Sequence, residues 1–106
     1  MNLEINKNNN YEPFKDGVSI NIATDESINS IDSGIVVFMG EKEGYGNTLI
    51  IQQSNGVDVW YGNMETFNVN LYDYVSKGLS LGTSSNNLYL VFQKNEEFLD
   101  YKEFIK

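Results

Sequence analysis

The 106-residue sequence contains no histidine and no cysteine, and each absence removes a class of chemistry. Without cysteine there are no disulfides, no thiolate nucleophile and no cysteine-based zinc site. Without histidine, no serine has the usual neighbouring base. Seven basic residues against fifteen acidic ones give a formal charge of −8, which repels nucleic acid and anionic membrane surfaces. We therefore expect no nucleic-acid partner.

Long apolar runs are also missing. No stretch approaches the roughly 20 residues needed to span a bilayer, and the sequence shows no signal-peptide pattern. We therefore expect a soluble chain whose membrane anchor, if it has one, lies outside this sequence. The length suits a single domain with one core. The one proline, Pro13, precedes the first clear strand and interrupts no sheet.

Short runs of valine, isoleucine and aromatic residues, separated by glycine, asparagine, aspartate and serine, predict strands joined by tight turns. The dipeptide Asn55-Gly56 predicts a hairpin between strands at 47–53 and 57–61. Residues 18–22 alternate as a half-buried strand should, whereas 35–39 form a continuous apolar run that predicts burial on both faces. A last central strand is expected at 87–93.

The fold class predicted is all-β, a compact antiparallel β-sandwich or barrel, with a short helical turn within 96–105. Residues 1–14 are expected to be a polar lead-in and 15–106 the domain. The predicted core comprises Ile35, Val37, Leu49, Ile51, Val59, Leu88 and Leu90.

Several motifs then occur in a fixed order: Gly44-Tyr45-Gly46-Asn47, the run Leu49-Ile50-Ile51, Asn55-Gly56, Tyr61-Gly62-Asn63-Met64, Val75-Ser76-Lys77-Gly78 and Leu81-Gly82. Their order and spacing resemble the LytM (M23) zinc endopeptidase domain. The pattern of that family reads G-Y-G-N, an apolar strand, N-G, Y-x-H-L, V-x-x-G, I-G and H-L-H-F. The resemblance implies the LytM-type β fold.

The same resemblance implies where a zinc site would lie. In the family, zinc is held by the His and Asp of H-x-G-x-D and by the second His of H-x-H, and a water completes the tetrahedron. Another His, in Y-x-H-L, assists the reaction. The corresponding positions in this sequence are Lys15, Ser19, Asn63, Asn87 and Tyr89. None of the five keeps the family residue, so we expect no metal, no cofactor and no peptidase activity.

Two replacement chemistries remain conceivable. Asp16, Asp58 and Asp73 offer oxygen ligands for hard cations, but no EF-hand or other carboxylate spacing is present, and solvated surface carboxylates explain them better. Ser19 and Lys15 lie four residues apart, which places them on one face of a strand. A Ser-Lys pair is therefore conceivable, but this spacing alone is weak support for it.

The middle of the chain narrows the resemblance to one degenerate, sporulation-related branch of the family. The W-Y-G segment Trp60-Tyr61-Gly62 and the segment Leu71-Tyr72-Asp73-Tyr74-Val75 are similar to it. This implies a regulatory scaffold in the intermembrane space around the forespore, tethered to the mother-cell-derived membrane. Its implied partners are an intramembrane metalloprotease complex, which activates pro-sigma-K, and a signalling serine protease that cleaves it.

Aromatic residues near the expected site, Trp60, Tyr61, Tyr72 and Tyr74, are candidate partner contacts, although core and strand packing explains any one of them somewhat better. Cleavage is expected in polar loops, at 29–33 or 83–87. Two other functions remain open: another degenerate LytM module, such as a forespore channel component or an amidase activator, and a peptidoglycan-binding module.

Overall fold

The computed structural model describes residues 10–105. Within them, nine strands form one antiparallel sheet in the order β1-β2-β8-β6-β5-β4-β7, with β3 and β9 also paired to β8. The strands are β1 (Tyr11–Phe14), β2 (Gly17–Asn21), β3 (Ser27–Asn29), β4 (Gly34–Lys42), β5 (Gly46–Gln53), β6 (Asp58–Phe67), β7 (Tyr74–Val75), β8 (Ser80–Lys94) and β9 (Glu97–Phe98). This arrangement confirms the all-β fold class.

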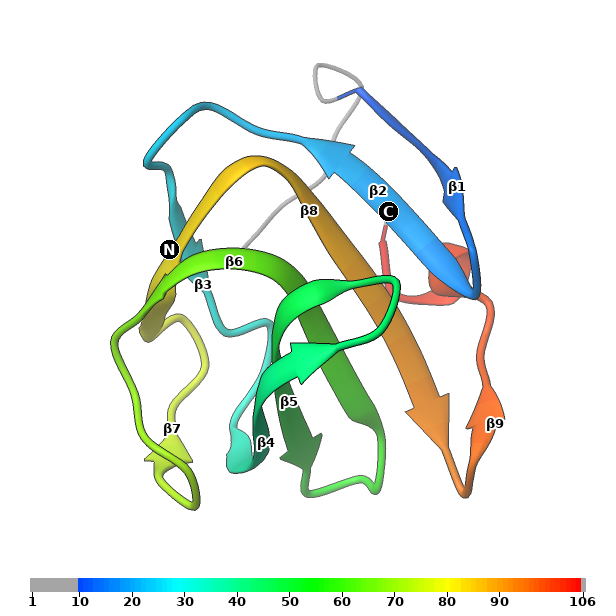
Figure 1. Ribbon diagram of the computed structural model, residues 1–106. Coiled ribbons are helices and arrows are strands. Elements are labelled where there is room, and N and C mark those ends of the chain that lie inside the picture. Colours follow the sequence, from blue (N-terminus) through cyan, green and yellow to red (C-terminus); the bar gives the residue numbers. More distant parts are fainter. Residues whose placement is uncertain (1–9, 106) are drawn as a thin grey trace.

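The long strands β6 and β8 lie side by side and bend together over the centre of the molecule (Figure 1). The turn at Asn55-Gly56 joins β5 to β6, as predicted, and Asn55 Oδ1 accepts a hydrogen bond from Val57 N–H at 3.0 Å. The expected C-terminal helical turn is a 3-10 turn at Tyr101–Glu103. No helix long and apolar enough to cross a bilayer occurs in the described range, 10–105.

The N-terminal boundary differs from the expected one. Most of the predicted lead-in, residues 1–9, lies outside the described residues. However, Tyr11–Phe14 already form β1, and Tyr11 pairs with Ile20 on β2. The sheet therefore begins ahead of Lys15, where the domain was expected to start, because the β1–β2 hairpin extends it by one strand.

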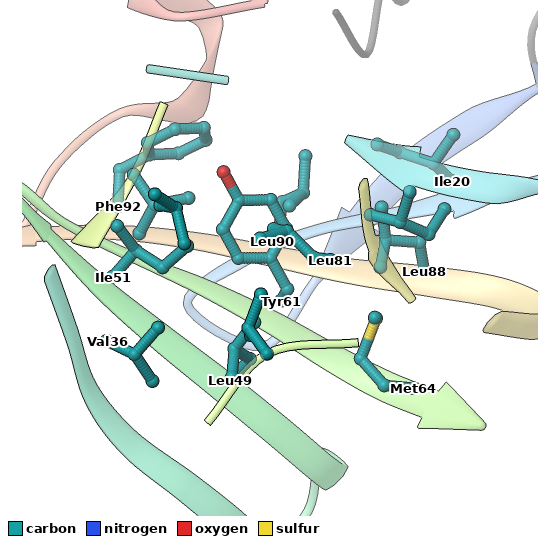
Figure 2. Close-up of a cluster of buried hydrophobic side chains, with 14 of the residues drawn as sticks. Ile20, Val36, Leu49, Ile51, Tyr61, Met64, Leu81, Leu88, Leu90 and Phe92 are labelled. Atoms are coloured by element: carbon teal, nitrogen blue, oxygen red, sulfur yellow. The ribbon is translucent and has the colours of Figure 1, made fainter. Parts of the chain in front are cut away.

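The main core lies on one face of the sheet. Successive residues of a strand point to opposite faces, and the cross-strand rows Leu49–Tyr61–Leu90 and Ile51–Val59–Phe92 point inward. Figure 2 shows the Tyr61 ring in the middle of these buried apolar side chains. The core predictions for Leu49, Ile51, Val59, Leu88 and Leu90 are confirmed, since each is fully buried.

Two predicted core residues were wrong. Ile35 and Val37 are exposed, and Val36 between them is buried in their place. A continuous apolar run conceals the two-residue period of a strand, so the sequence did not show which residues of β4 face inward. The outer side of β4 is not covered by another layer of the described chain, and the expected burial of 35–39 on both faces therefore does not occur.

A second, smaller apolar cluster covers part of the opposite face. The row Ile50–Trp60–Val91 runs across β5, β6 and β8, one residue out of step with the core rows. Tyr45 completes the cluster from the β4–β5 turn. This opposite face, which we call the outer face, carries most of the predicted site.

Candidate functional site

Cross-strand pairing brings three of the five predicted site positions together. Ser19 on β2 lies opposite Tyr89 on β8, and Tyr89 in turn lies opposite Gly62 on β6. Asn87 is two residues before Tyr89, so it shares the same face and lies opposite Asn21. Ser19, Asn87 and Tyr89 are all half-buried. The sequence alignment with the family therefore predicted a real cluster on the outer face.

Asn63 is held beside this cluster by its own hydrogen bonds. It occupies an irregular point in the β6–β8 pairing and has a positive φ of 62°. Its backbone N–H donates to Tyr45 O at 2.7 Å, and its side-chain Nδ2 donates to Asn87 O at 2.7 Å. The amide thus ties β6 to β8, which is a structural role.

Lys15 lies at the edge of the cluster, in the β1–β2 turn. It also has a positive φ, 50°, and its side chain is exposed. Its Nζ stands 5.6 Å from the centre of the Phe14 ring, within the range of a cation–π contact. The ammonium therefore stays at the surface and makes no hydrogen bond with Ser19, so the Ser-Lys pair does not form in this structure.

An aromatic cluster fills the place between these positions. The Phe14 and Tyr89 rings stack with centroids 4.1 Å apart, and Tyr45 meets the Trp60 ring edge-on at 5.3 Å. Burial raises the pKa of the Tyr45 hydroxyl; the Asp16 N–H, which donates to this oxygen at 3.4 Å, lowers it, and the Asp16 carboxylate raises it. The Tyr45 hydroxyl is therefore neutral at physiological pH.

The residues present do not fit zinc. Of the three ligand positions that the family pattern defines, Lys15 carries a positive charge, Ser19 a neutral hydroxyl and Tyr89 a phenol engaged in ring stacking. Zinc sites use thiolate, imidazole and carboxylate donors. Within residues 10–105, no three His, Cys, Asp or Glu side chains are grouped so as to hold a metal ion.

The four predicted partner contacts do not lie together. Tyr61 has no accessible surface. Its hydroxyl accepts a hydrogen bond from Ile31 N–H at 3.0 Å, so it is a core residue and cannot contact a partner. Trp60 is on the outer face but only 8% exposed, since Tyr45 and Phe98 pack edge-on against it and Lys42 Nζ stands 4.7 Å above its ring.

Tyr72 and Tyr74, in contrast, are 73% and 65% exposed. Both lie at the opposite end of the sheet, where Tyr74 on β7 pairs with Ile35 on β4. They therefore remain available for contact, at a distance from the positions of the family's site residues.

The two predicted cleavage segments differ in the structure: residues 30–33 connect β3 to β4 outside any strand, with Asp32 exposed, whereas 83–87 do not form a loop. Within 29–33, Asn29 and Ser30 are buried, and Ser30 N–H donates to Leu79 O at 2.8 Å. The segment 83–87 is an internal part of β8 rather than a loop. Exposed turns lie elsewhere, for example at 23–25 and 94–98.

A polar pocket of about 270 Å³ adjoins the aromatic cluster, and sequence reasoning missed it. Its lining residues are Asn10, Tyr11, Glu12, Ser19, Asn21 and Asn87. Two of these, Ser19 and Asn87, are positions of the family's site residues. The others come from β1, β2 and the residue before β1, and only strand register brings them together, so no local motif marks the pocket.

The fold and the arrangement of these positions are those of the M23 class. Residues 13–101 match the model of Peptidase family M23, and the chain belongs to this family. The catalytic domain of lysostaphin from Staphylococcus simulans superposes with a TM-score of 0.80 at 20% identity, over 92% of each chain. Csd3 from Helicobacter pylori superposes with a TM-score of 0.78 at 28% identity, over 86% of this chain and 26% of Csd3.

Among curated proteins, the chain is similar to stage IV sporulation protein FA of Bacillus subtilis (strain 168). The two are 26% identical over 96 residues, which are 85% of this chain and 36% of that protein. The chain thus spans about a third of the length of this relative.

Proposed function

We propose that this domain is a non-catalytic regulator and scaffold in the intermembrane space around the forespore. In the full-length protein it is tethered to the outer forespore membrane. It restrains and positions the intramembrane metalloprotease that activates pro-sigma-K, until a signalling serine protease cleaves it. The observation that carries the proposal is the set of side chains at the five former catalytic positions, none of which is a family ligand or base. The similarity to stage IV sporulation protein FA supports the biological setting.

The partner contact in this proposal is the apolar surface at the β4–β7 edge. Its exposed members are Ile35, Leu71, Tyr72 and Tyr74, and Ile35 lies directly opposite Tyr74. Grouped exposed apolar side chains mark interaction sites more often than single ones do, and tyrosine is enriched at binding hot spots.

The backbone holds Tyr72 in this exposed position at some cost. Its φ is +73°, which is unfavourable for a bulky side chain by on the order of 1–3 kcal/mol. Tyr72 N–H donates to Val36 O at 2.8 Å, and Asp73 Oδ2 caps the turn by accepting from Asn70 N–H at 2.9 Å. A strained aromatic residue kept at the surface by a fixed turn is well placed to recognise a partner.

The test replaces Tyr72 and Tyr74 singly with alanine in the full-length tethered protein, in sporulating cells. We expect less of the metalloprotease complex to assemble with the variant and the timing of pro-sigma-K processing to change. Phe98→Ala is the matched control, since Phe98 is also an exposed aromatic residue but lies on β9. Each variant is first shown to unfold at the temperature of the unmodified domain.

Normal assembly and normal processing in both tyrosine variants would show that this surface is not the contact. The competing function is tested separately by sedimenting the purified domain with peptidoglycan. Retention that Tyr72→Ala leaves unchanged, together with normal processing in cells, would favour a peptidoglycan-binding module instead.

A further inference from the structure

The polar pocket beside the aromatic cluster is built from two parallel rows of side chains on the outer face. Glu12, Ser19 and Tyr89 are successive cross-strand partners on β1, β2 and β8. Two residues along, Asn21 lies opposite Asn87, and Asn21 N–H donates to Asn10 O at 2.8 Å.

The side chains that line the pocket are free to bind a ligand. Within residues 10–105, the side chains of Asn10, Glu12, Ser19, Asn21 and Asn87 take part in no hydrogen bond or ion pair with the protein. Each of the five presents at least one acceptor oxygen. Several unpaired acceptors around one pocket are the kind of convergent polar groups that define a binding site.

The negative charge of the pocket favours a cationic ligand. Glu12 is the one charged residue among its lining residues, and the chain as a whole carries −8. A phosphate or a carboxylate would meet the Glu12 carboxylate with no cation in the lining to offset the repulsion. A cation would be attracted both by that carboxylate and by the field of the whole protein.

The spacing of the acceptor oxygens favours a guanidinium group over an ammonium group. They lie on three neighbouring strands, and adjacent strands are about 4.8 Å apart. An ammonium directs its three donors from a single nitrogen, whereas a guanidinium spreads five donors over a planar fork and is more weakly hydrated. The pocket volume, about 270 Å³, lies just below the range of whole small-molecule sites, which suits a single side chain.

We propose that this pocket binds the guanidinium group of an arginine side chain, with Glu12 as its counter-ion and the side chains of Ser19, Asn21 and Asn87 as hydrogen-bond acceptors. That the arginine belongs to an extended segment of a partner protein rests on the proposed partner-binding function. The binding of a guanidinium group does not depend on that function.

The test uses the whole 106-residue chain and Nα-acetyl-arginine amide as the probe. The side-chain amide NMR signals of Asn10, Asn21 and Asn87 are followed during the titration. Nα-acetyl-citrulline amide is the matched neutral probe, because it keeps the shape of arginine and removes the charge. We expect the arginine probe to shift these signals and to bind about three- to fivefold more tightly than the citrulline probe, as suits a partly exposed ion pair.

Glu12→Gln is the matched variant. It should bring the affinity for the arginine probe down to that for the citrulline probe, whereas Glu97→Gln, an equal charge change at an exposed position on β9, should leave the difference unchanged. The proposal fails if both probes bind equally, if a chitin oligosaccharide shifts these signals and arginine does not, or if arginine shifts none of them. These results concern the isolated domain and are independent of assembly in cells, so the pocket and the proposed function can fail separately.

Discussion

The sequence predicted that Tyr61 contacts a partner, whereas the structure places it in the core. Removing its hydroxyl group tests the core assignment. In the structure, Tyr61 is fully buried and its hydroxyl accepts the Ile31 N–H bond at 3.0 Å. Tyr61→Phe keeps the ring and leaves that N–H without its acceptor. A buried donor left unsatisfied costs about 1–3 kcal/mol. Ile31 is only half-buried, so water can compensate in part, and we expect a loss of about 1–2 kcal/mol.

Alkaline pH provides a second measurement of the same group. Burial raises the pKa of the Tyr61 hydroxyl to about 12, and the Asp32 charge adds to this, while the Ile31 hydrogen bond opposes it. The unfolded chain has a tyrosine pKa of about 10. Because the folded pKa is the higher one, the contribution to stability is complete below pH 10 and is lost as pH rises from 10 to 12. The total loss is on the order of 2–3 kcal/mol.

Urea unfolding followed by Trp60 fluorescence, at pH 8 and in steps from pH 9.5 to 11.5, measures both effects. Tyr61→Phe should be less stable at pH 8 and should show a shallower decline at high pH. Some decline will remain, because the pKa of Tyr45 is also raised. Tyr72→Phe is the control, since its side chain is 73% exposed, and it should behave as the unmodified domain. Equal stability and an equal alkaline decline in Tyr61→Phe would refute the core assignment.

Three further predictions concern the core, one glycine and the metal. Leu49→Ala should cost about 2–5 kcal/mol of unfolding free energy, as for other buried leucines. Ile35→Ala should cost less than about 1 kcal/mol, because Ile35 is exposed. Equal losses in denaturant titrations would contradict the assignment of the inward and outward faces of β4. Gly82→Ala should lower the melting temperature more than Gly40→Ala. A Cβ at Gly82 would lie 1.9 Å from Thr66 O, whereas a Cβ at Gly40 meets nothing closer than 3.9 Å. The reverse order in thermal unfolding would be inconsistent with the β6–β8 packing. Finally, protein purified without chelator should contain no stoichiometric zinc, and EDTA should leave its melting temperature unchanged; a fall with EDTA would reveal a bound metal that stabilises the fold.

The parts of the fold that depend on neighbouring residues were predictable from the sequence. The Asn55-Gly56 turn and the alternation at 18–22 are local signals, and both correspond to observed elements. The burial of Leu49, Ile51 and Leu90 followed from the same patterns, because a strand with one covered face buries alternate residues.

The parts that depend on strand register were not predictable. Trp60 and Tyr61 are adjacent, so one must face the core and the other the outer face. Only pairing with Ile50 and Leu49 on β5 decides which residue takes which face. The same limit applies to the pocket, whose asparagines are far apart in the sequence. The family pattern did predict that Ser19, Asn87 and Tyr89 would lie together, because in the family the corresponding residues meet at one site.

Aromatic packing holds the outer face of this M23 domain together. Phe14 on β1 stacks on Tyr89 of β8, two strands away, and the strand between them carries Gly17 opposite Phe14, where a Cβ would lie 1.9 Å from Leu90 O. Each such aromatic pair is worth about 0.5–1.5 kcal/mol beyond its buried area. Packing of this kind joins the same strands that carry the ligand positions in the family pattern. The face is thereby divided into an aromatic part that stabilises the domain and a polar part with unpaired acceptors, where the proposed binding pocket lies.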